Sequence, residues 1–486
     1  MKEIYIYGAA VQGIQSFIFR TNELKDIVGA SELVEHICTK FFKDEFLQNG
    51  EALITAAGNI KCKYSNEEEC KKTVRLFPKK VMEKAPGITI SQAVVKCTED
   101  ELQNDFQKLM NQLEGKLHAQ RNKQAKSMTL GLMSLERSRK TGLPAIRRNN
   151  DEYIDEATLK KRELSEGAKA TIKLCEKSFG QEHVSPRNIA LNIGELTDKN
   201  DWIAIIHADG NGLGEVVQRK ASTEEGLKDF SQNLDHATID AARAAFRAAC
   251  TSIGSNEKYP FRPVVLGGDD MTVICKASLA LPYVKEYIKN FEEKTKEYLG
   301  YKLTACAGIA YIKSAYPFHY GYSLAEILCS QAKKVSKSPS VSKGAASAPS
   351  SIMFYKVQSS FIESYDLLIE KEKTPQDGMQ LSAGPYFLND TEGYWTIDKL
   401  QEVVGLLTGK EGNTAKTAIR KWMTFMHQNI EMAEQSCKRS KEILQGKMAE
   451  VFREATNPIC RLGTKFYPAG DIIDLFTIQN QITKED

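Results

Sequence analysis

The sequence lacks several features that would assign the protein to a familiar class. None of its eleven cysteines forms a Cys-x-x-Cys pair, and their number is odd. This argues against a zinc ribbon and against a disulfide framework, and it favours a reducing cytoplasm. The opening residues, MKEIYIYGAAVQGIQ, have no basic segment followed by a long apolar core, and no apolar run approaches the length of a membrane span. We therefore expect neither a signal peptide nor a membrane segment.

The charge balance does not identify a partner. Lysine and arginine number 66 and aspartate and glutamate 63, so the formal net charge is only +3. A local basic stretch does occur, and it contains Arg121, Lys123, Lys126, Arg137, Arg139, Lys140, Arg147 and Arg148. A solvated connector between domains explains this stretch at least as well as an RNA or triphosphate contact.

The chain repeats one order of predicted elements. With 486 residues it is too long for a single ordinary core, and we expect about three domains. Strand, helix, hairpin, helix, strand and helix are predicted twice, at 3–10, 23–42, 52–64, 67–84, 87–97 and 101–117, and again at 202–212, 222–252, 262–276, 281–299, 303–313 and 323–337. This order is typical of a ferredoxin-like unit, in which helices cover one face of an antiparallel sheet. The sequence therefore predicts an α+β fold with two such units related by a pseudo-two-fold axis.

The repeat sets the expected domain boundaries. We expect a first unit at 1–118, a basic connecting region at 119–194, a second unit at 195–357 and a mostly helical domain at 358–486. Within the second unit, the Ser/Ala/Pro/Gly-rich segment 336–351 indicates a flexible loop before a short closing strand.

The second unit carries two acidic turns. The strand at 202–212 ends in HADGNG, which contains Asp209, and the strand-like run RPVVLGGDDMTVICK at 262–276 is interrupted by GGDD. A plain β-hairpin explains GGDD taken alone. On neighbouring strands of one sheet, however, the two turns would bring hard oxygen ligands together, which suit a pair of Mg²⁺ or Mn²⁺ ions. These candidate ligands are Asp209, Asp269, Asp270 and the carbonyl of Gly210, and the glycines that allow a tight turn and a close approach by phosphate are Gly267 and Gly268.

Two further observations bear on this candidate site. Lys333 and Lys334 end the last helix of the second unit, where they pair favourably with the helix C-terminus or reach a triphosphate. The first unit has AAGN at 56–59 in place of GGDD, and Gly8 and Ala9 in place of Asp209. We therefore expect metal ions only beside GGDD, and a first unit that shapes or binds without metals of its own.

Together these motifs resemble the large palm-domain subunit of type III CRISPR effector complexes, in its Cmr-type branch, whose palms are related to polymerases and nucleotidyl cyclases. The resemblance rests on HADGNGLG (207–214), GGDD (267–270), AKK (332–334), IQSFIFRTNELKDIVGASELV (14–34) and TGLPA (141–145). It implies that ATP is condensed into cyclic oligoadenylates, which act as second messengers in antiviral defence. It also implies metal binding at Asp209, Asp269 and Asp270, a phosphate-binding turn at Gly267 and Gly268, triphosphate contact by Lys333, and a nucleotide contact by Ser231.

The chain departs from this family in two ways. It contains no His-Asp dipeptide, so we expect no HD nuclease and no cleavage of single-stranded DNA, and without a Cys-x-x-Cys pair we expect no structural zinc. GGDD also differs from the GGDEF turn of diguanylate cyclases, which makes cyclic di-GMP the less expected product.

Three activities therefore stay open. The first is nucleotidyltransfer on ATP, with two nucleotides facing each other across the two units. The second is synthesis of another nucleotide conjugate or cyclic dinucleotide. The third is a scaffold subunit that binds guide or target RNA and other effector subunits.

Overall fold

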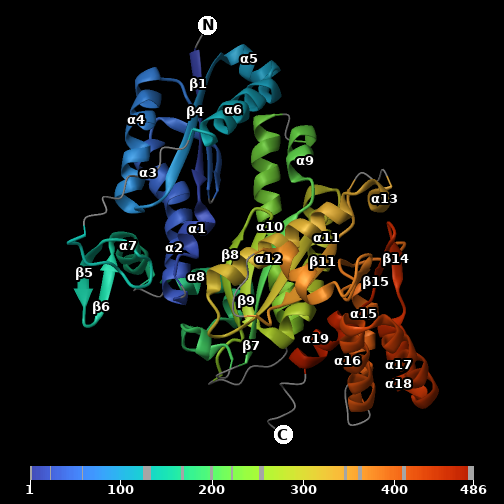
Figure 1. Cartoon of the computed structure of the whole chain (residues 1–486). Helices are drawn as coiled ribbons and strands as arrows, with labels where there is room; N and C mark the ends of the chain where they lie inside the picture. The colour runs from blue at the N-terminus through green and yellow to red at the C-terminus, as the bar shows by residue number, and fades with distance from the viewer. Residues whose placement is uncertain are drawn as a thin grey trace.

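The computed structural model describes residues 3–21, 23–56, 58–123, 133–165, 169–197, 201–220, 223–250, 257–343, 347–359, 364–407 and 412–479. Lys126, Ala57, the ends of the expected helix at 222–252 and part of the loop at 336–351 lie outside these residues. Two α/β units lie next to each other, and a largely helical part follows the second (Figure 1). None of the helices within these ranges is long and apolar enough to cross a membrane.

The first unit folds around a four-stranded antiparallel sheet with the strand order β2-β3-β1-β4. Its elements are β1 (Glu3–Gln12), α1 (Ile14–Ile18), α2 (Leu24–His36), η1 (Ile37–Phe41), α3 (Phe42–Phe46), β2 (Gly50–Ala56), β3 (Asn59–Tyr64), α4 (Glu67–Lys84), β4 (Thr89–Thr98), α5 (Glu99–Asn104) and α6 (Phe106–Arg121). Successive side chains of β1 point to opposite faces of the sheet. Tyr5 and Tyr7 pack in the core with α2, α3 and α4, whereas Ile4 and Ile6 pack with α5 and α6.

The second unit contains the longer sheet, with the strand order β13-β11-β10-β7-β9-β8. Its elements are β7 (Trp202–Gly210), α9 (Leu213–Lys220), α10 (Glu224–Ala249), β8 (Phe261–Gly267), β9 (Asp270–Lys276), α11 (Ala277–Leu299), β10 (Ala305–Lys313), α12 (Phe318–Ser336), α13 (Pro339–Ser342) and β11 (Ser351–Lys356). Ala204 and Ile206 of β7 face the core built with α10 and α11. Ile203 and Ile205 face the opposite core, which contains α12 and parts of the first unit.

The expectation that helices cover only one face of each sheet is therefore wrong. In both units the last helix crosses to the other face: α6 packs on β4 and β1, and α12 packs on β10 and β7. In the second unit this crossing joins β10 to a strand that is parallel to it, β11. A parallel pair needs a long crossover connection, and α12 supplies it.

A glycine allows α12 to approach β10 closely. A Cβ atom at Gly308 would lie 2.0 Å from the carbonyl oxygen of Ala325 and 2.5 Å from the backbone nitrogen of Cys329. The backbones of α12 and β10 are thus in direct contact at this point. This contact fixes the position of the C-terminal end of α12, where Lys333 lies.

The two units contact each other reciprocally, as a pseudo-two-fold relation requires. Helix α2 of the first unit packs against β8, and the corresponding helix α10 of the second packs against β2. Ion pairs support the second contact: Lys63 Nζ lies 2.7 Å from a carboxylate oxygen of Glu224, and Lys228 Nζ lies 2.6 Å from one of Glu51.

The connecting region between the two units contacts both of them. It contains β5 (Ala145–Asn149), β6 (Glu152–Asp155), α7 (Glu156–Ser165), α8 (Lys169–Phe179) and the 3₁₀ turns η2 (Gln181–His183), η3 (Pro186–Asn188) and η4 (Ile193–Glu195). Arg162 Nε donates to Asp26 of α2 over 2.6 Å. Helix α8 packs against α10 and β8 of the second unit.

The last part of the chain continues from the second unit. It contains α14 (Tyr365–Leu368), η5 (Ile369–Lys373), β12 (Met379–Gln380), β13 (Tyr386–Phe387), α15 (Ile397–Leu406), α16 (Gly412–Gln428), α17 (Ile430–Ile443), α18 (Gly446–Thr456), β14 (Ile459–Arg461), β15 (Thr464–Phe466) and α19 (Ala469–Gln479). Although β13 lies beyond the expected boundary at residue 357, it pairs with β11.

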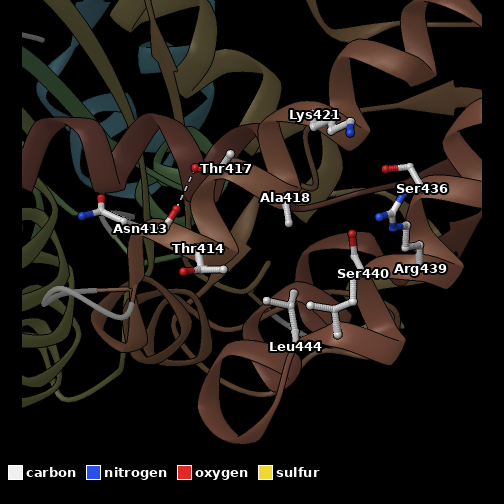
Figure 2. A pocket seen from close by; sticks show the side chains of 10 residues that line it. Asn413, Thr414, Thr417, Ala418, Lys421, Ser436, Arg439, Ser440 and Leu444 are labelled. Atoms are coloured by element: carbon white, nitrogen blue, oxygen red, sulfur yellow. Dashed lines mark hydrogen bonds between the residues drawn. The ribbon is translucent and has the colours of Figure 1, made fainter.

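An open groove of about 580 Å³ between α16 and α17 is lined by hydroxyl groups, Lys421 and Arg439 (Figure 2).

Candidate metal and nucleotide site

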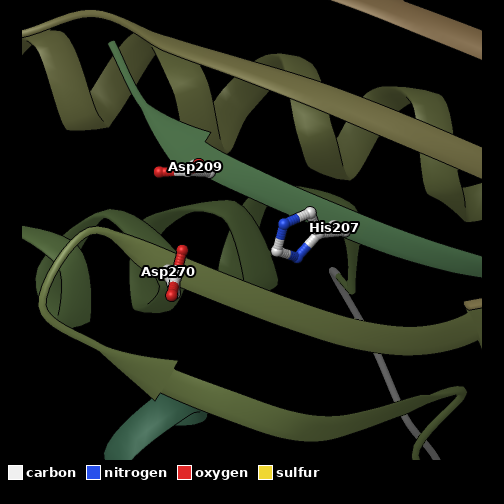
Figure 3. A group of neighbouring side chains, drawn as sticks. All are labelled: His207, Asp209 and Asp270. Carbon is white, nitrogen blue, oxygen red and sulfur yellow. The ribbon is translucent and has the colours of Figure 1, made fainter. Parts of the chain in front are cut away.

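The two acidic turns meet at one end of the second sheet. Strands β7 and β9 are antiparallel neighbours, and Ala208 lies opposite Met271, so Asp209 lies beside Asp270. The alternation along the strands puts His207 and Asp209 on the same face as Asp270 and Thr272. This is the face that α12 and the first unit cover. Figure 3 shows His207 and Asp209 projecting from β7 toward Asp270 on β9.

These side chains form a compact group of potential ligands. One ring nitrogen of His207 and one carboxylate oxygen each of Asp209 and Asp270 all lie within 4.8 Å of one another. His207 was not among the predicted site residues. The sequence held a signal for it, because a residue two positions before Asp209 on a strand must share its face.

The GGDD turn places the third predicted carboxylate beside the same strand end. Gly267 pairs with Asp270, and Gly268 has φ +62°, the positive value that the first central residue of a type II′ hairpin turn requires. Asp269 lies against Gly210, where an added Cβ atom would come within 3.1 Å of both Cβ and Oδ2 of Asp269. A residue with a side chain at position 210 would therefore require the Asp269 side chain to shift by a few tenths of an ångström.

The group is electrostatically unfavourable without a cation. Burial, together with the charges of Asp270 and Asp209, raises the pKa of Asp269 well above its usual range. Solvent reaches Asp270, yet partial desolvation and the charge of Asp209 raise its pKa to about 7. Like charges held this close favour protonation or a bound cation.

Lys333 already places a positive charge on two of the predicted metal ligands. Its Nζ donates to the Gly210 carbonyl oxygen over 2.8 Å and forms an ion pair with Asp209. Desolvation lowers the pKa of Lys333, but Asp209 outweighs it and the net pKa is raised. An ammonium group on these oxygens shows that they suit a cation, so the donor set fits Mg²⁺ or Mn²⁺. Lys334, in contrast, is exposed about 100° further round α12.

Three residues that the sequence did not single out hold the GGDD turn. Thr238 of α10 donates to the Gly268 carbonyl oxygen over 2.5 Å, and the Gly268 N–H donates to Asp235 over 3.3 Å. Lys177 of α8 donates to the Leu266 carbonyl oxygen over 2.8 Å. The predicted nucleotide contact Ser231 lies one helical turn before Asp235, on the same side of α10.

The register of the first unit identifies its counterparts of these residues. Ala56 pairs with Asn59 as Gly267 pairs with Asp270, so Asn59 occupies the position of Asp270 and Gly58 that of Asp269. The counterpart of Asp209 is Ala10, which lies opposite Asn59. The expectation that Gly8 and Ala9 stand in the place of Asp209 is wrong, because β1 continues to Gln12 rather than ending at residue 10.

The raised pKa of Asp270 predicts a pH-dependent stability. A carboxyl group whose pKa is raised from about 4 in the unfolded chain to about 7 in the folded state destabilises the fold progressively as pH rises between these two values. In the metal-free protein, Asp270→Asn should therefore raise Tm by about 2 °C at pH 8, by less at pH 5.5, and hardly at all near pH 4. Thermal unfolding in a chelating buffer measures this difference. Added Mn²⁺ should then raise Tm of the wild type more than that of the variant, and a pH-independent difference would contradict the assignment of the charge repulsion.

Because Thr238 supports the GGDD turn, removal of its hydroxyl group should lower the turnover of the reaction at this site. Thr238→Val keeps the shape of the side chain but removes the hydrogen bond to Gly268. We expect about 10-fold lower turnover, the usual lower limit for a residue that orients a ligand, and a stability loss of about 1 kcal/mol. Thr456→Val is the matched control, because its hydroxyl also donates to a backbone carbonyl in a buried part of a helix. Equal turnover in the two variants would show that the turn needs no support from α10.

Comparisons with known proteins show which family model and which solved structures this chain resembles. Residues 202–341 match the family model of the second palm domain of Cas10/Cmr2. No match is found among curated protein sequences. Among solved structures, a Csm1-Csm4 cassette in complex with pppApA is similar with a TM-score of 0.60 and 12% identity, over 99% of this chain and 69% of that chain. The cassette in complex with cA4 gives a TM-score of 0.59 and 12% identity, over 99% and 70%.

Csm1 from T. onnurineus is similar with a TM-score of 0.57 and 13% identity, over 99% of this chain and 70% of that chain. At such identities the likeness to solved structures concerns the fold, whereas the family model identifies the domain that carries GGDD. The resemblance inferred from the motifs is thereby confirmed: residues 202–341 match the second palm domain of Cas10/Cmr2, and the fold of the chain is similar to that of Csm1, which in one solved structure is part of the type III-A CRISPR-Csm interference complex.

Proposed function

We propose that this protein is a metal-dependent nucleotidyltransferase that condenses ATP into cyclic oligoadenylates in a type III CRISPR-like defence. The observation that carries the proposal is the meeting of Asp209 and Asp270 with Lys333 at a strand end facing the first unit. The solved Csm1-Csm4 cassettes of the same fold contain pppApA and cA4, which supports an adenine nucleotide as substrate here.

The residues of the site have distinct roles in this reaction. Asp209, Asp270, Asp269 and the Gly210 carbonyl would hold Mg²⁺ or Mn²⁺. When bound, such ions activate an attacking hydroxyl and stabilise a leaving pyrophosphate. Gly267 and Gly268 present backbone without side chains to the triphosphate, and Lys333 neutralises part of its charge.

The reaction itself joins two nucleotides. The 3′-oxygen of one ATP attacks the α-phosphorus of another, the bond from that phosphorus to the β-phosphate bridge breaks, and pyrophosphate leaves with the hydroxyl proton passing to solvent. Ring closure repeats the same step within one molecule, so each ATP consumed releases one pyrophosphate.

The first unit lies where it can hold the second nucleotide. Phe19, just after α1, stacks on Tyr322 of α12 with ring centroids 3.8 Å apart, and Tyr322 meets His207 edge-on at 5.8 Å. The carboxylate site therefore lies next to the contact between the two units. Holding both nucleotides across this contact would align the attacking hydroxyl with the α-phosphate by proximity.

An RNA-binding role in an effector complex is compatible with this activity. Arg147 and Arg148 of β5 are exposed, on a strand of the connecting region whose residues 146–149 all face solvent. Exposed arginines on one strand suit contacts to RNA phosphates. We propose guide or target RNA and other effector subunits as partners.

Competition among the four nucleoside triphosphates tests the proposed substrate. With Mn²⁺ and an equimolar mixture, we expect ATP to be consumed at least about 10-fold faster than GTP, CTP or UTP, because a bidentate contact to a base edge contributes roughly 1–3 kcal/mol of discrimination. Pyrophosphate release per ATP and the mass of the product are measured together. Faster use of GTP, or a linear product that grows along a template, would overturn the proposal in favour of another cyclase or a polymerase.

A further inference from the structure

We propose that His207 is a nitrogen ligand of the metal site and makes the site select a first-row transition metal such as Mn²⁺ over Mg²⁺. This inference rests on the proposed function, because it extends the ligand set at Asp209 and Asp270. The geometry that carries it is the group of three potential ligand atoms within 4.8 Å.

The position of His207 is set by its surroundings. Its side chain is only 7% exposed, and its Nδ1 lies 3.2 Å from the Thr272 hydroxyl oxygen of the neighbouring strand. Within the part of the chain that the structure describes, this contact with Thr272 is the hydrogen bond that the imidazole ring of His207 forms. Figure 3 shows the nitrogen-bearing side of the ring turned toward Asp209 and Asp270. With Nδ1–H donating to Thr272, the lone pair of Nε2 is left for a metal, and such a partner orients histidine ligands in metal sites.

The distances suit a metal centre after a small contraction. In an octahedral site with bonds of about 2 Å, ligand atoms lie about 3 Å apart when adjacent and about 4 Å apart when opposite. Atoms within 4.8 Å therefore need shifts of less than about 1 Å, which side-chain rotation supplies. Independent support for a cation at this place comes from Lys333, whose ammonium group contacts Asp209 and the Gly210 carbonyl oxygen.

A mixed nitrogen and oxygen ligand set changes the metal preference. Mg²⁺ takes oxygen ligands in near-ideal octahedral geometry and retains several waters. Imidazole is a ligand for transition metals, and geometry and ligand type set their selectivity. A site of two carboxylates, one carbonyl and one imidazole therefore favours Mn²⁺ over Mg²⁺.

The test uses the full chain loaded with Mn²⁺ and measures electron spin-echo modulation, which detects nitrogen bound directly to Mn²⁺. We expect coupling to ¹⁴N in protein of natural isotope content and to ¹⁵N in protein labelled only in histidine. His207→Gln should abolish this coupling and weaken Mn²⁺ binding at least 10-fold, while Mg²⁺ binding changes by less than 3-fold. His319→Gln, at an exposed histidine of α12, is the control and should leave the coupling and both affinities unchanged.

The possible outcomes separate this inference from the proposed function. Mn²⁺ that binds through Asp209 and Asp270 without histidine coupling would overturn the role of His207 and leave the metal site intact. Mn²⁺ binding that persists in Asp209→Asn with Asp270→Asn would overturn the proposed function itself. The labelling experiment uses the wild-type sequence, so it decides the question even if His207→Gln does not fold.

Discussion

Asp269→Asn combined with Asp270→Asn should lower ATP turnover by about 10³-fold or more. The two substitutions remove the turn carboxylates that would hold the metal, and metal stabilisation of a charged transition state contributes several kcal/mol. The fold should persist, because neither side chain contributes to an apolar core and both are destabilised by their like charges. Turnover is measured by pyrophosphate release, and folding by Tm.

Asp377→Asn is the control for the change in charge. Asp377 is exposed in a turn of the last part of the chain, and this variant should retain wild-type turnover. If the double variant at Asp269 and Asp270 also retained it, the chemistry would have to occur elsewhere in the molecule.

Gly308→Ala should be strongly destabilising. The new methyl group would lie 2.0 Å from the Ala325 carbonyl oxygen, so α12 would have to move away from β10. Overpacking of a core usually costs 1–3 kcal/mol, and a clash with rigid backbone belongs at the upper end, so we expect a loss of about 3 kcal/mol. Because α12 carries Lys333, turnover should also fall in any protein that folds. Denaturant unfolding measures the first effect.

Gly405→Ala is the matched control for this glycine. Gly405 lies within α15, and an added Cβ atom would meet no other heavy atom within 4 Å. The substitution should be neutral or stabilise by up to about 1 kcal/mol, because alanine favours helix. Similar losses in both variants would mean that α12 and β10 are not in direct contact.

The sequence identified the elements that depend on local pattern. The helix at 67–84 begins and ends as expected, since Asn66 caps its N-terminus and acidic residues fill its first turn. The GGDD turn was also predictable, because glycine and aspartate interrupt an otherwise apolar strand run and the structure forms the hairpin there.

Features that depend on contacts between distant segments were not predictable. Periodicity does not specify which face of a sheet a helix will cover, so the crossing of α6 and α12 to the other face was missed. The support of GGDD by Thr238 and Lys177 depends on how α10 and α8 pack, and their own sequence neighbourhoods carry no sign of it. Lys333 and Lys334 are adjacent in the sequence, but each residue of a helix is rotated by about 100° from the one before it. This rotation decides which of the two lysines reaches Asp209.

The central claim is that metal and triphosphate bind at the carboxylates of the second unit and not in the first. Crystals grown with Mn²⁺ and a non-hydrolysable ATP analogue test it through the anomalous scattering of Mn²⁺. We predict anomalous peaks between Asp209 and Asp270, with the triphosphate against Gly267 and Gly268. Peaks beside Asn59 in the first unit, or none within reach of Asp209 and Asp270 while the analogue is bound, would contradict the account.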